Sequence, residues 1–292
     1  MASLKEIRTR LSSVKSTRQI TSAMKMVSAA KLRRAQDAII RMRPYANKLL
    51  EILSSLSENL ETDDDNIYGN VREVKKALLV VITSNKGLCG AFNANVAKMT
   101  MLLAEEKYRT LYRDGRLDII VIGKKGADLL KTKRYKILES HHELFDHLNF
   151  EKTLPLTNKI LSSFAESEYD EVQIIYNQFR NAAVHELTIE QFLPISPVKS
   201  EPGTDNDIYY IFEPSQEYIV KELIPKYLRI LLYKALLDSN ASEHGARMTA
   251  MHKATDNATE LIKQLQLDYN KARQASITKE ILEIVGGAEA LK

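Results

Sequence analysis

The segment ALLVVITSNKGLCGAFN, residues 77–93, passes from an apolar run through a glycine-containing turn into a helical stretch. Its first seven residues are almost all apolar or β-branched, which is typical of a strand that is buried on both faces. Residues 117–123, LDIIVIG, repeat the pattern and are again followed by a turn and a helical stretch. Strands that alternate with helices predict an α/β fold with a mostly parallel, doubly wound sheet.

Neighbouring segments extend this sheet into a domain that we place at residues 75–213. We expect further strands at 172–176 and 187–192, another at 208–212, and a crossover helix at 154–165. The sheet would therefore occupy the middle of the chain.

Residues 1–60 carry a long helical pattern before this domain. It opens with a capping box of Ser3 and Glu6. Apolar residues with heptad spacing follow at Leu4, Ile7, Leu11 and Val14, and again at Ala35, Ile39, Met42, Ala46, Leu49, Leu53, Leu56 and Leu60. Between the two stretches the apolar face becomes small or polar, through Ser28 and Lys31.

Residues 215–287 carry a second helical pattern after the domain. Ser215 is its expected N-cap, and the glycine pair at 286–287 is its expected end. Heptad-spaced positions run from Met251 to Leu282 and are apolar except at Asp268 and Lys279, where we expect register control or local solvation. Two long helices at opposite ends of one chain predict an antiparallel coiled coil.

The composition excludes several classes of protein. The chain has 292 residues, of which 44% are apolar and 27% charged, and its one cysteine is Cys89. These fractions are typical of a globular protein, not of a disordered one, and a single cysteine cannot form an internal disulfide. No apolar run approaches the roughly 18 residues of a membrane span, and no signal peptide is evident. We therefore expect a soluble protein of a reducing compartment.

The charge is distributed unevenly along the chain. Residues 1–43 hold eleven Lys or Arg and two acidic residues, a net charge of +9, whereas the whole chain carries +4. A basic N-terminal segment suits a transit peptide, a nucleic-acid arm or a helix that enters an acidic protein surface. A transit peptide fits poorly, because the helical pattern continues past residue 50 without a break.

The tetrapeptide Gly123–Gly126, GKKG, matches the GxxG loop by which KH domains hold a nucleic-acid backbone. A KH loop joins two helices, however, and here the seven preceding residues have the pattern of a buried strand. We therefore favour a turn between a strand and a helix, and keep a KH-like nucleic-acid-binding protein as the alternative function.

The turn Ser84–Asn93, SNKGLCGAFN, stands where a phosphate-binding loop would stand, between a strand and a helix. It has neither the GxxxxGK[ST] nor the GxGxxG spacing, so a nucleotide-dependent enzyme is the weaker third hypothesis. We expect Gly87 and Gly90 to permit a tight turn and close packing of the helix on the sheet.

Two further groups of reactive side chains have structural interpretations. His141, His142 and His147 lack the i, i+4 spacing of a helical zinc site, so we expect a solvated loop and no metal. Cys89 has no second cysteine nearby and is expected to be a small buried apolar residue. The sequence thus predicts no catalytic residue and no cofactor.

Three segments together resemble the gamma subunit of F-type ATP synthases. They are residues 20–36, ITSAMKMVSAAKLRRAQ, the turn at 84–93, and the C-terminal stretches GARMTAMHKATDNA at 245–258 and RQASITKEILEIVGGAEAL at 273–291. Order and spacing agree over essentially the whole chain. Asn85 and Ala91 depart from the Asp and Gly common in the family, and the regulatory cysteine pair of the chloroplast form is absent.

The resemblance implies a fold, partners and a function. The two terminal helices would form a coiled coil inside a hexamer of alternating alpha and beta subunits, and a Rossmann-like middle domain would sit on the membrane ring of c subunits beside the epsilon subunit. Such a central-stalk rotor subunit couples rotation of the c ring, driven by proton flow, to conformational change at the catalytic sites. It would be non-catalytic itself and bound peripherally, through its complex, to the cytoplasmic face of a bacterial inner membrane.

The resemblance also carries over individual residues. The hexamer contacts that it implies are Met24, Lys25, Arg33, Arg34, Arg247, Gln274, Leu282, Ile284 and Val285. Arg247 and Gln274 would hydrogen-bond catch loops of a beta subunit, and the last three would turn in an apolar bearing. The foot near the c ring and epsilon would include Tyr209, Tyr210 and Phe212.

Overall fold

The computed structural model describes residues 4–57, 67–195 and 216–289. The predicted strand at 208–212, the N-cap Ser215 and the foot residues Tyr209, Tyr210 and Phe212 lie outside them. Contacts divide the chain into two compact units, residues 30–246 and residues 1–29 with 247–292, and each is described by itself below. Within the described ranges no helix is long and apolar enough to cross a membrane.

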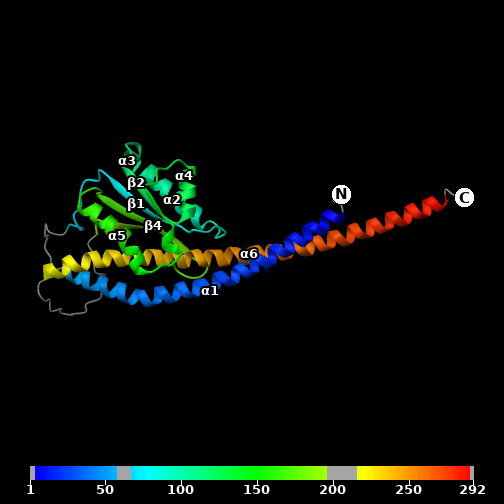
Figure 1. Cartoon of the computed structure of the whole chain (residues 1–292), viewed down its shortest axis with the longest axis horizontal. Coiled ribbons are helices and arrows are strands. Elements are labelled where there is room, and N and C mark those ends of the chain that lie inside the picture. Colours follow the sequence, from blue (N-terminus) through cyan, green and yellow to red (C-terminus); the bar gives the residue numbers. More distant parts are fainter. Residues whose placement is uncertain (1–3, 58–66, 196–215, 290–292) are drawn as a thin grey trace. The chain divides into compact units, whose positions relative to one another are not determined.

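The unit 30–246 is built on a five-stranded sheet of order β3-β2-β1-β4-β5 (Figure 1). The strands are β1 (Ala77–Ile82), β2 (Leu117–Ile122), β3 (Glu139–His141), β4 (Glu171–Phe179) and β5 (His185–Leu193). The first four in that spatial order are parallel, and β5 runs antiparallel to β4. The mostly parallel sheet predicted from the sequence is therefore confirmed, with an additional edge strand, β3.

Helices cover both faces of this sheet. On one face lie α2 (Phe92–Glu106), α3 (Arg109–Arg113) and α4 (Lys124–Thr132). Alternate strand residues point to this face, such as Leu79 and Val81 of β1, which pack with Val96 and Leu130 of the helices. The other face packs on α5 (Phe150–Ala165), which begins four residues before the predicted start because the Asn149 side chain caps it. A short 3-10 helix, η1 (Glu143–Phe145), follows β3 and packs with the same face through Leu144.

The long terminal helices also contribute to the second face. They are α1 (Leu4–Ser57) and α6 (Gln216–Glu289). Apolar residues of α6 between Ile224 and Leu236 pack with Leu78 and Val80 of β1, and Leu53 of α1 joins them. This part of α6 is apolar around most of its circumference, as suits a helix enclosed between a sheet and another helix.

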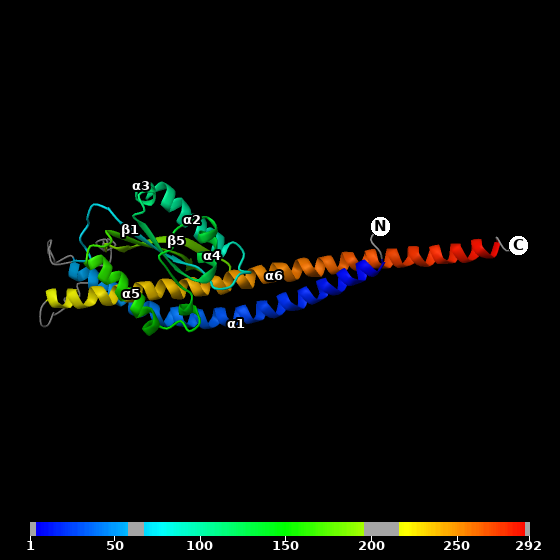
Figure 2. The ribbon, with the colours of Figure 1, turned by 45° about the horizontal axis from the view of Figure 1, so that its top comes forward.

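In the unit of residues 1–29 and 247–292, the described residues are the first turns of α1 and the C-terminal part of α6, and α1 lies antiparallel along α6 (Figures 1 and 2). Met251, Ala258 and Leu265 of α6 are buried against α1. The predicted face Leu4, Ile7, Leu11 and Val14 is half-buried, while the residues between these positions are exposed. The antiparallel coiled coil predicted from the sequence is thus confirmed.

Three details of the helix predictions were wrong. Lys31 is exposed, and the buried residue there is Leu32, with 4% exposure. The heptad positions Ala275 and Leu282 are exposed and not buried in the coiled coil, whereas the exposure of Asp268 and Lys279 agrees with the local solvation expected for them. The glycine pair at 286–287 does not end α6, which continues to Glu289.

Candidate functional site

The predicted partner contacts lie along two helices and do not form one cluster. In the unit 1–29/247–292, Gln274, Leu282, Ile284 and Val285 are exposed, and Met24 and Lys25 are half-buried. Arg247 differs from the others, because its side chain is only 7% exposed. In the unit 30–246, Arg33 and Arg34 are exposed. Among the described residues, the predicted contacts are therefore spread along helix surfaces and do not enclose a common cavity.

Polar contacts fix the register of the two helices near Lys25. The Lys25 Nζ atom lies 3.4 Å from His252 Nδ1. One turn away the Thr255 hydroxyl donates to Thr21 Oγ1 at 2.8 Å, and Thr21 is 8% exposed. These pairs join positions more than 200 residues apart in sequence, so they hold this part of α1 in one register on α6.

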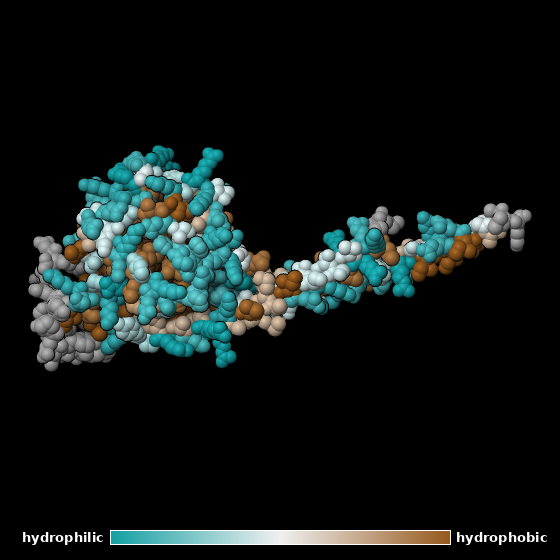
Figure 3. Space-filling model, viewed as in Figure 1, coloured by the Kyte–Doolittle hydropathy of each residue, from teal (hydrophilic) through white to brown (hydrophobic). Residues whose placement is uncertain are grey.

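The C-terminal part of α6 carries a stripe of exposed apolar side chains. Ile277, Ile281 and Ile284 follow i, i+4, i+7 spacing and are 44%, 54% and 71% exposed, with Leu282 at 65% and Val285 at 55% (Figure 3). Contiguous exposed apolar surface on a helix marks a place where another protein binds. The sequence analysis identified three of these five residues and missed the two isoleucines at 277 and 281, although their spacing was a readable signal.

A second exposed apolar group lies on α1 and was also missed. Ile20, Met26 and Val27 are 60%, 66% and 58% exposed. All three lie outside the heptad face that packs on α6. Apolar residues outside the buried face of a helix are a sequence signal of a contact surface, and this signal could have identified them.

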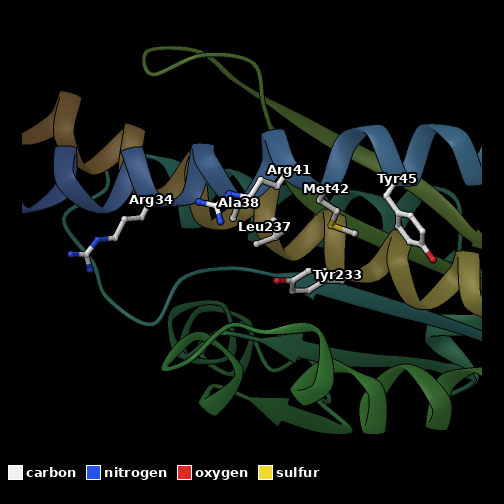
Figure 4. A pocket seen from close by; sticks show the side chains of 7 residues that line it. All are labelled: Arg34, Ala38, Arg41, Met42, Tyr45, Tyr233 and Leu237. Carbon is white, nitrogen blue, oxygen red and sulfur yellow. The ribbon is translucent and has the colours of Figure 1, made fainter.

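A basic groove lies between α1 and α6 in the unit 30–246 (Figure 4). Its volume is about 530 Å³, and its lining residues are Arg34, Ala38, Arg41, Met42, Tyr45, Tyr233 and Leu237. Two arginines and two phenols above apolar side chains suit an acidic protein segment, because guanidinium groups bind carboxylates with two parallel hydrogen bonds.

The loop Ser84–Asn93 is held by its own side chains. Asn93 Oδ1 accepts a hydrogen bond from Ser84 N at 2.9 Å, and Asn93 Nδ2 donates to Ser84 Oγ at 2.8 Å. Cys89 is 2% exposed, which confirms the buried interpretation. Gly90 has φ +61°, as the predicted tight turn requires. The predicted close packing at Gly87 and Gly90 was wrong, since a Cβ at Gly90 would meet nothing within 4 Å and one at Gly87 only Lys125 Cε at 4.0 Å.

Close packing occurs instead at the glycines of GKKG. A Cβ on Gly123 would lie 2.3 Å from Thr83 O, and one on Gly126 would lie 2.5 Å from Thr83 Oγ1. Gly123 follows β2 directly and Lys124 begins α4, so the predicted turn between a strand and a helix is confirmed.

The first N–H groups of α4 are already occupied. Lys124 N donates to Asn85 Oδ1 at 3.1 Å, Lys125 N to Ser84 O at 3.0 Å, and Gly126 N to Thr83 Oγ1 at 3.0 Å. A phosphate at a helix N-terminus needs these donors free. The geometry therefore gives no support to a nucleic-acid or nucleotide role for GKKG.

His142 and His147 lie in exposed segments outside the strands and helices, as predicted, but His141 does not. His141 belongs to β3, with Nε2 3.0 Å from Glu139 Oε2 and Nδ1 3.1 Å from Glu143 Oε1. A hydrogen bond from Lys159, opposed by burial and reinforced by His141, lowers the pKa of the Glu139 carboxyl. The short strand was missed because its three residues, ESH, carry no apolar pattern. In the described part of the chain no group of His, Cys, Asp and Glu is arranged to hold a metal.

Comparison with known proteins gives full-length matches. A family model described as ATP synthase matches residues 3–291. The ATP synthase gamma chain of Flavobacterium johnsoniae is 60% identical over 100% of this chain and 99% of that protein, and the gamma chain of Cytophaga hutchinsonii is 53% identical over the same shares.

Solved structures agree at the level of the fold. A chain in the central stalk and c-ring structure of the Tetrahymena thermophila mitochondrial ATP synthase is 27% identical, with a TM-score of 0.58 over 80% of this chain and 99% of that one. A chain of the Euglena gracilis mitochondrial enzyme is 24% identical, with a TM-score of 0.71 over 99% of this chain and 94% of that one. With heptad helices at both ends, a central parallel sheet and these full-length matches, the chain belongs to the family of ATP synthase gamma chains.

Proposed function

We propose that this chain is the central-stalk rotor subunit of an ATP synthase, which couples rotation of a membrane c ring to conformational change at the catalytic sites of an alpha/beta hexamer. The full-length similarity to bacterial gamma chains, at up to 60% identity in the relatives described above, carries this conclusion. The subunit is non-catalytic, since catalysis in such enzymes lies in the beta subunits. It forms part of a membrane-associated complex, and we place it at the cytoplasmic face of the bacterial inner membrane.

The coiled coil supplies the coupling mechanism. Two antiparallel helices have no threefold symmetry, so a shaft made of them presents different side chains to each of three surrounding beta subunits. Each beta subunit therefore binds nucleotide with a different affinity at any moment. Rotation by a third of a turn transfers each state to the next subunit, without any bond chemistry on the shaft itself.

The exposed side chains suggest where the hexamer binds. We assign Met24, Lys25, Arg33 and Arg34 to its constriction, and Leu282, Ile284 and Val285 to an apolar bearing at its far end. The exposure of the last three, from 55% to 71%, supports their part of the assignment. The basic groove at Arg34 and Arg41 would receive an acidic segment of a beta subunit.

The coiled coil and the α/β domain would bind different partners. We assign the coiled-coil segments 1–60 and 215–287 to the hexamer and the α/β domain 75–213 to the foot. That foot would contact the c ring and the epsilon subunit, with Tyr209, Tyr210 and Phe212 among the contacts. The core formed with α6 between Ile224 and Leu236 would anchor the shaft in the foot.

Arg247 and Gln274 provide the first test, because we expect them to bind the catch loops of a beta subunit. In the assembled enzyme, replacing both by alanine should lower ATP-driven turnover while the subunit still assembles. Arg113→Ala, which removes an exposed arginine of α3, should leave turnover unchanged. Unaltered turnover in the double variant would contradict the catch-loop assignment.

Affinity purification of the tagged chain tests the function itself. The chain should be recovered in an ATP-hydrolysing complex with a several-fold excess of two larger nucleotide-binding subunits. Recovery of the chain alone, or with RNA, would overturn the rotor assignment.

A further inference from the structure

One stripe of α6 faces the hairpin formed by β4 and β5. Ser242 Oγ donates to the carbonyl oxygen of Asn177 in β4 at 3.0 Å. A Cβ on Gly245 would lie 2.8 Å from the carbonyl oxygen of Ala182 in the turn of the hairpin. Residues 238, 242 and 245 are spaced i, i+4, i+7 and therefore share one side of the helix. Asp238 is thus the third member of the stripe that packs on this hairpin.

The Asp238 carboxyl is buried, and one of its two oxygens lacks a hydrogen-bond donor among the described residues. The residue is 1% exposed, and its Oδ1 atom has no hydrogen-bond partner among the described residues. The neighbouring Ser239 is also 1% exposed, and its hydroxyl has no partner there either. An ionised carboxylate loses its hydration on burial and needs donors in return. The Oδ1 atom of Asp238 has obtained none from the described residues.

Several titratable groups interact electrostatically with Asp238. They are Lys234 on α6, Arg43 on α1, Arg180 in the hairpin turn, Glu190 on β5 and the phenol of Tyr176 on β4. Within the described part of the chain, no Lys or Arg nitrogen lies within 4.0 Å of an Asp238 carboxylate oxygen, so Asp238 forms no ion pair there.

Four of these groups are bonded elsewhere. Arg43 Nη2 donates to Phe179 O at 3.5 Å, and Arg180 Nε pairs with Glu186 at 3.0 Å. Glu190 accepts a hydrogen bond from the Tyr176 hydroxyl at 2.8 Å. The surrounding charges therefore compensate the buried carboxylate only over a distance.

The pKa of the Asp238 carboxyl is raised to about 6, chiefly by burial and also by Glu190, while Lys234, Arg43 and Arg180 act in the opposite direction. A folded-state pKa above the ordinary value means that the folded chain binds the proton more tightly than the unfolded chain does. The stabilisation is complete below the ordinary value of 3.8 and is lost as the pH rises to about 6 and just beyond.

We propose that Asp238 is a proton-binding site of the unit 30–246, whose protonation tightens the packing of α6 on the β4–β5 hairpin and whose ionisation loosens it. The protonated carboxyl no longer has a charge to hydrate, so its burial against the hairpin costs less free energy than burial of the carboxylate. The ionised carboxylate attracts water or a counter-ion, which weakens the packing of α6 on the hairpin at Ser242 and Gly245.

Equilibrium urea unfolding of the full-length chain between pH 4 and 8 tests the linkage. Asp238→Asn keeps the shape and removes the titration. The ratio of the unfolding constants of wild type and Asp238→Asn should rise with pH, by roughly a hundredfold, and level off above about pH 7. A ratio that does not change with pH would overturn the proposal.

Asp118→Asn is the matched control. Asp118 is also buried, at 7% exposure, but it pairs with Lys76 at 3.2 Å and accepts a hydrogen bond from the Tyr169 hydroxyl at 3.1 Å. Neutralising it should destabilise the chain at pH 8, the opposite of the effect at Asp238. Stabilisation by both substitutions would show a general charge effect and refute a specific site.

A carboxyl NMR titration identifies the proton-binding group directly. In the full-length chain labelled with carboxyl-¹³C aspartate, one resonance should titrate with its midpoint near pH 6 and be absent from Asp238→Asn. If that variant fails to fold, through-bond assignment of the wild-type resonance replaces it. A midpoint for Asp238 near the ordinary 3.8 would refute the proposal.

Discussion

Gly245 combines an unfavourable helix propensity with a packing need that outweighs it. Glycine inside a helix costs about 1 kcal/mol relative to alanine. The sequence shows only that cost, because the 2.8 Å approach to Ala182 O involves residues 63 positions apart. We predict that Gly245→Ala destabilises the chain by about 1–3 kcal/mol, through displacement of the hairpin. Urea unfolding measures the change.

Gly286→Ala is the control for this substitution, because a Cβ there would meet nothing within 4 Å. It should be neutral or stabilise the chain by up to about 1 kcal/mol. If both variants gain stability, the contact of Gly245 with the hairpin does not constrain that position.

Asn93 illustrates a buried polar side chain that holds a loop. Its removal would leave the Ser84 N–H buried without its acceptor, which costs about 1–3 kcal/mol. We therefore expect Asn93→Ala to destabilise the full-length chain by that amount in thermal or urea unfolding. Asn95→Ala, at an exposed position of the same helix, should change stability by less than about 0.5 kcal/mol. Equal effects would exclude a special role for the Asn93 hydrogen bonds.

At the scale of single residues, sequence reasoning succeeded where the signal was local. The burial of Cys89 and the turn at GKKG follow from neighbouring residues alone. Close packing was assigned to Gly87 and Gly90 but occurs at Gly123 and Gly126, because only the fold brings these two against Thr83. The burial of Asp238 was not predicted for the same reason, since the charged groups Arg43, Arg180 and Glu190 that act on it come from three other elements.

At the scale of elements, the position of Leu32 decides where the buried face of α1 runs. Leu32 is 4% exposed, whereas the predicted face position Lys31 is exposed. Leu32→Ala should therefore destabilise the chain by about 2–4 kcal/mol, as buried leucine truncations do. Lys31→Ala should change stability by less than about 0.5 kcal/mol. Urea unfolding measures the stability of both variants. A larger loss of stability in Lys31→Ala than in Leu32→Ala would contradict the buried face described here.

Long periodic elements were predictable, and short or shared ones were not. Two strands, β1 and β2, and both terminal helices carry many repeats of one pattern. Strand β3 has three residues and no pattern to read. The use of Ile224–Leu236 in the core of the sheet was not predicted, because a buried helix and the end of a coiled coil have the same apolar signature in sequence.

At the scale of the whole molecule, the exposed stripe of α6 should govern how the free chain behaves. We predict that the isolated full-length chain self-associates at micromolar concentrations through Leu282, Ile284 and Val285, whose exposure ranges from 55% to 71%. Serine at all three positions should reduce that association in sedimentation velocity. Serine at Lys271, Arg273 and Lys279, which are exposed polar residues of the same helix, is the matched control and should leave self-association unchanged. Undiminished association of the serine variant would place the contact elsewhere.

Thr83 has a consequence for how related chains can differ. Its carbonyl oxygen and side chain occupy the space that a Cβ at Gly123 or Gly126 would need, and its hydroxyl accepts the Gly126 N–H. A mutation at any one of these three positions therefore changes which residues the other two can accept. Over evolutionary time positions 83, 123 and 126 should change together, so their covariation among relatives would record this contact even where overall identity has become low.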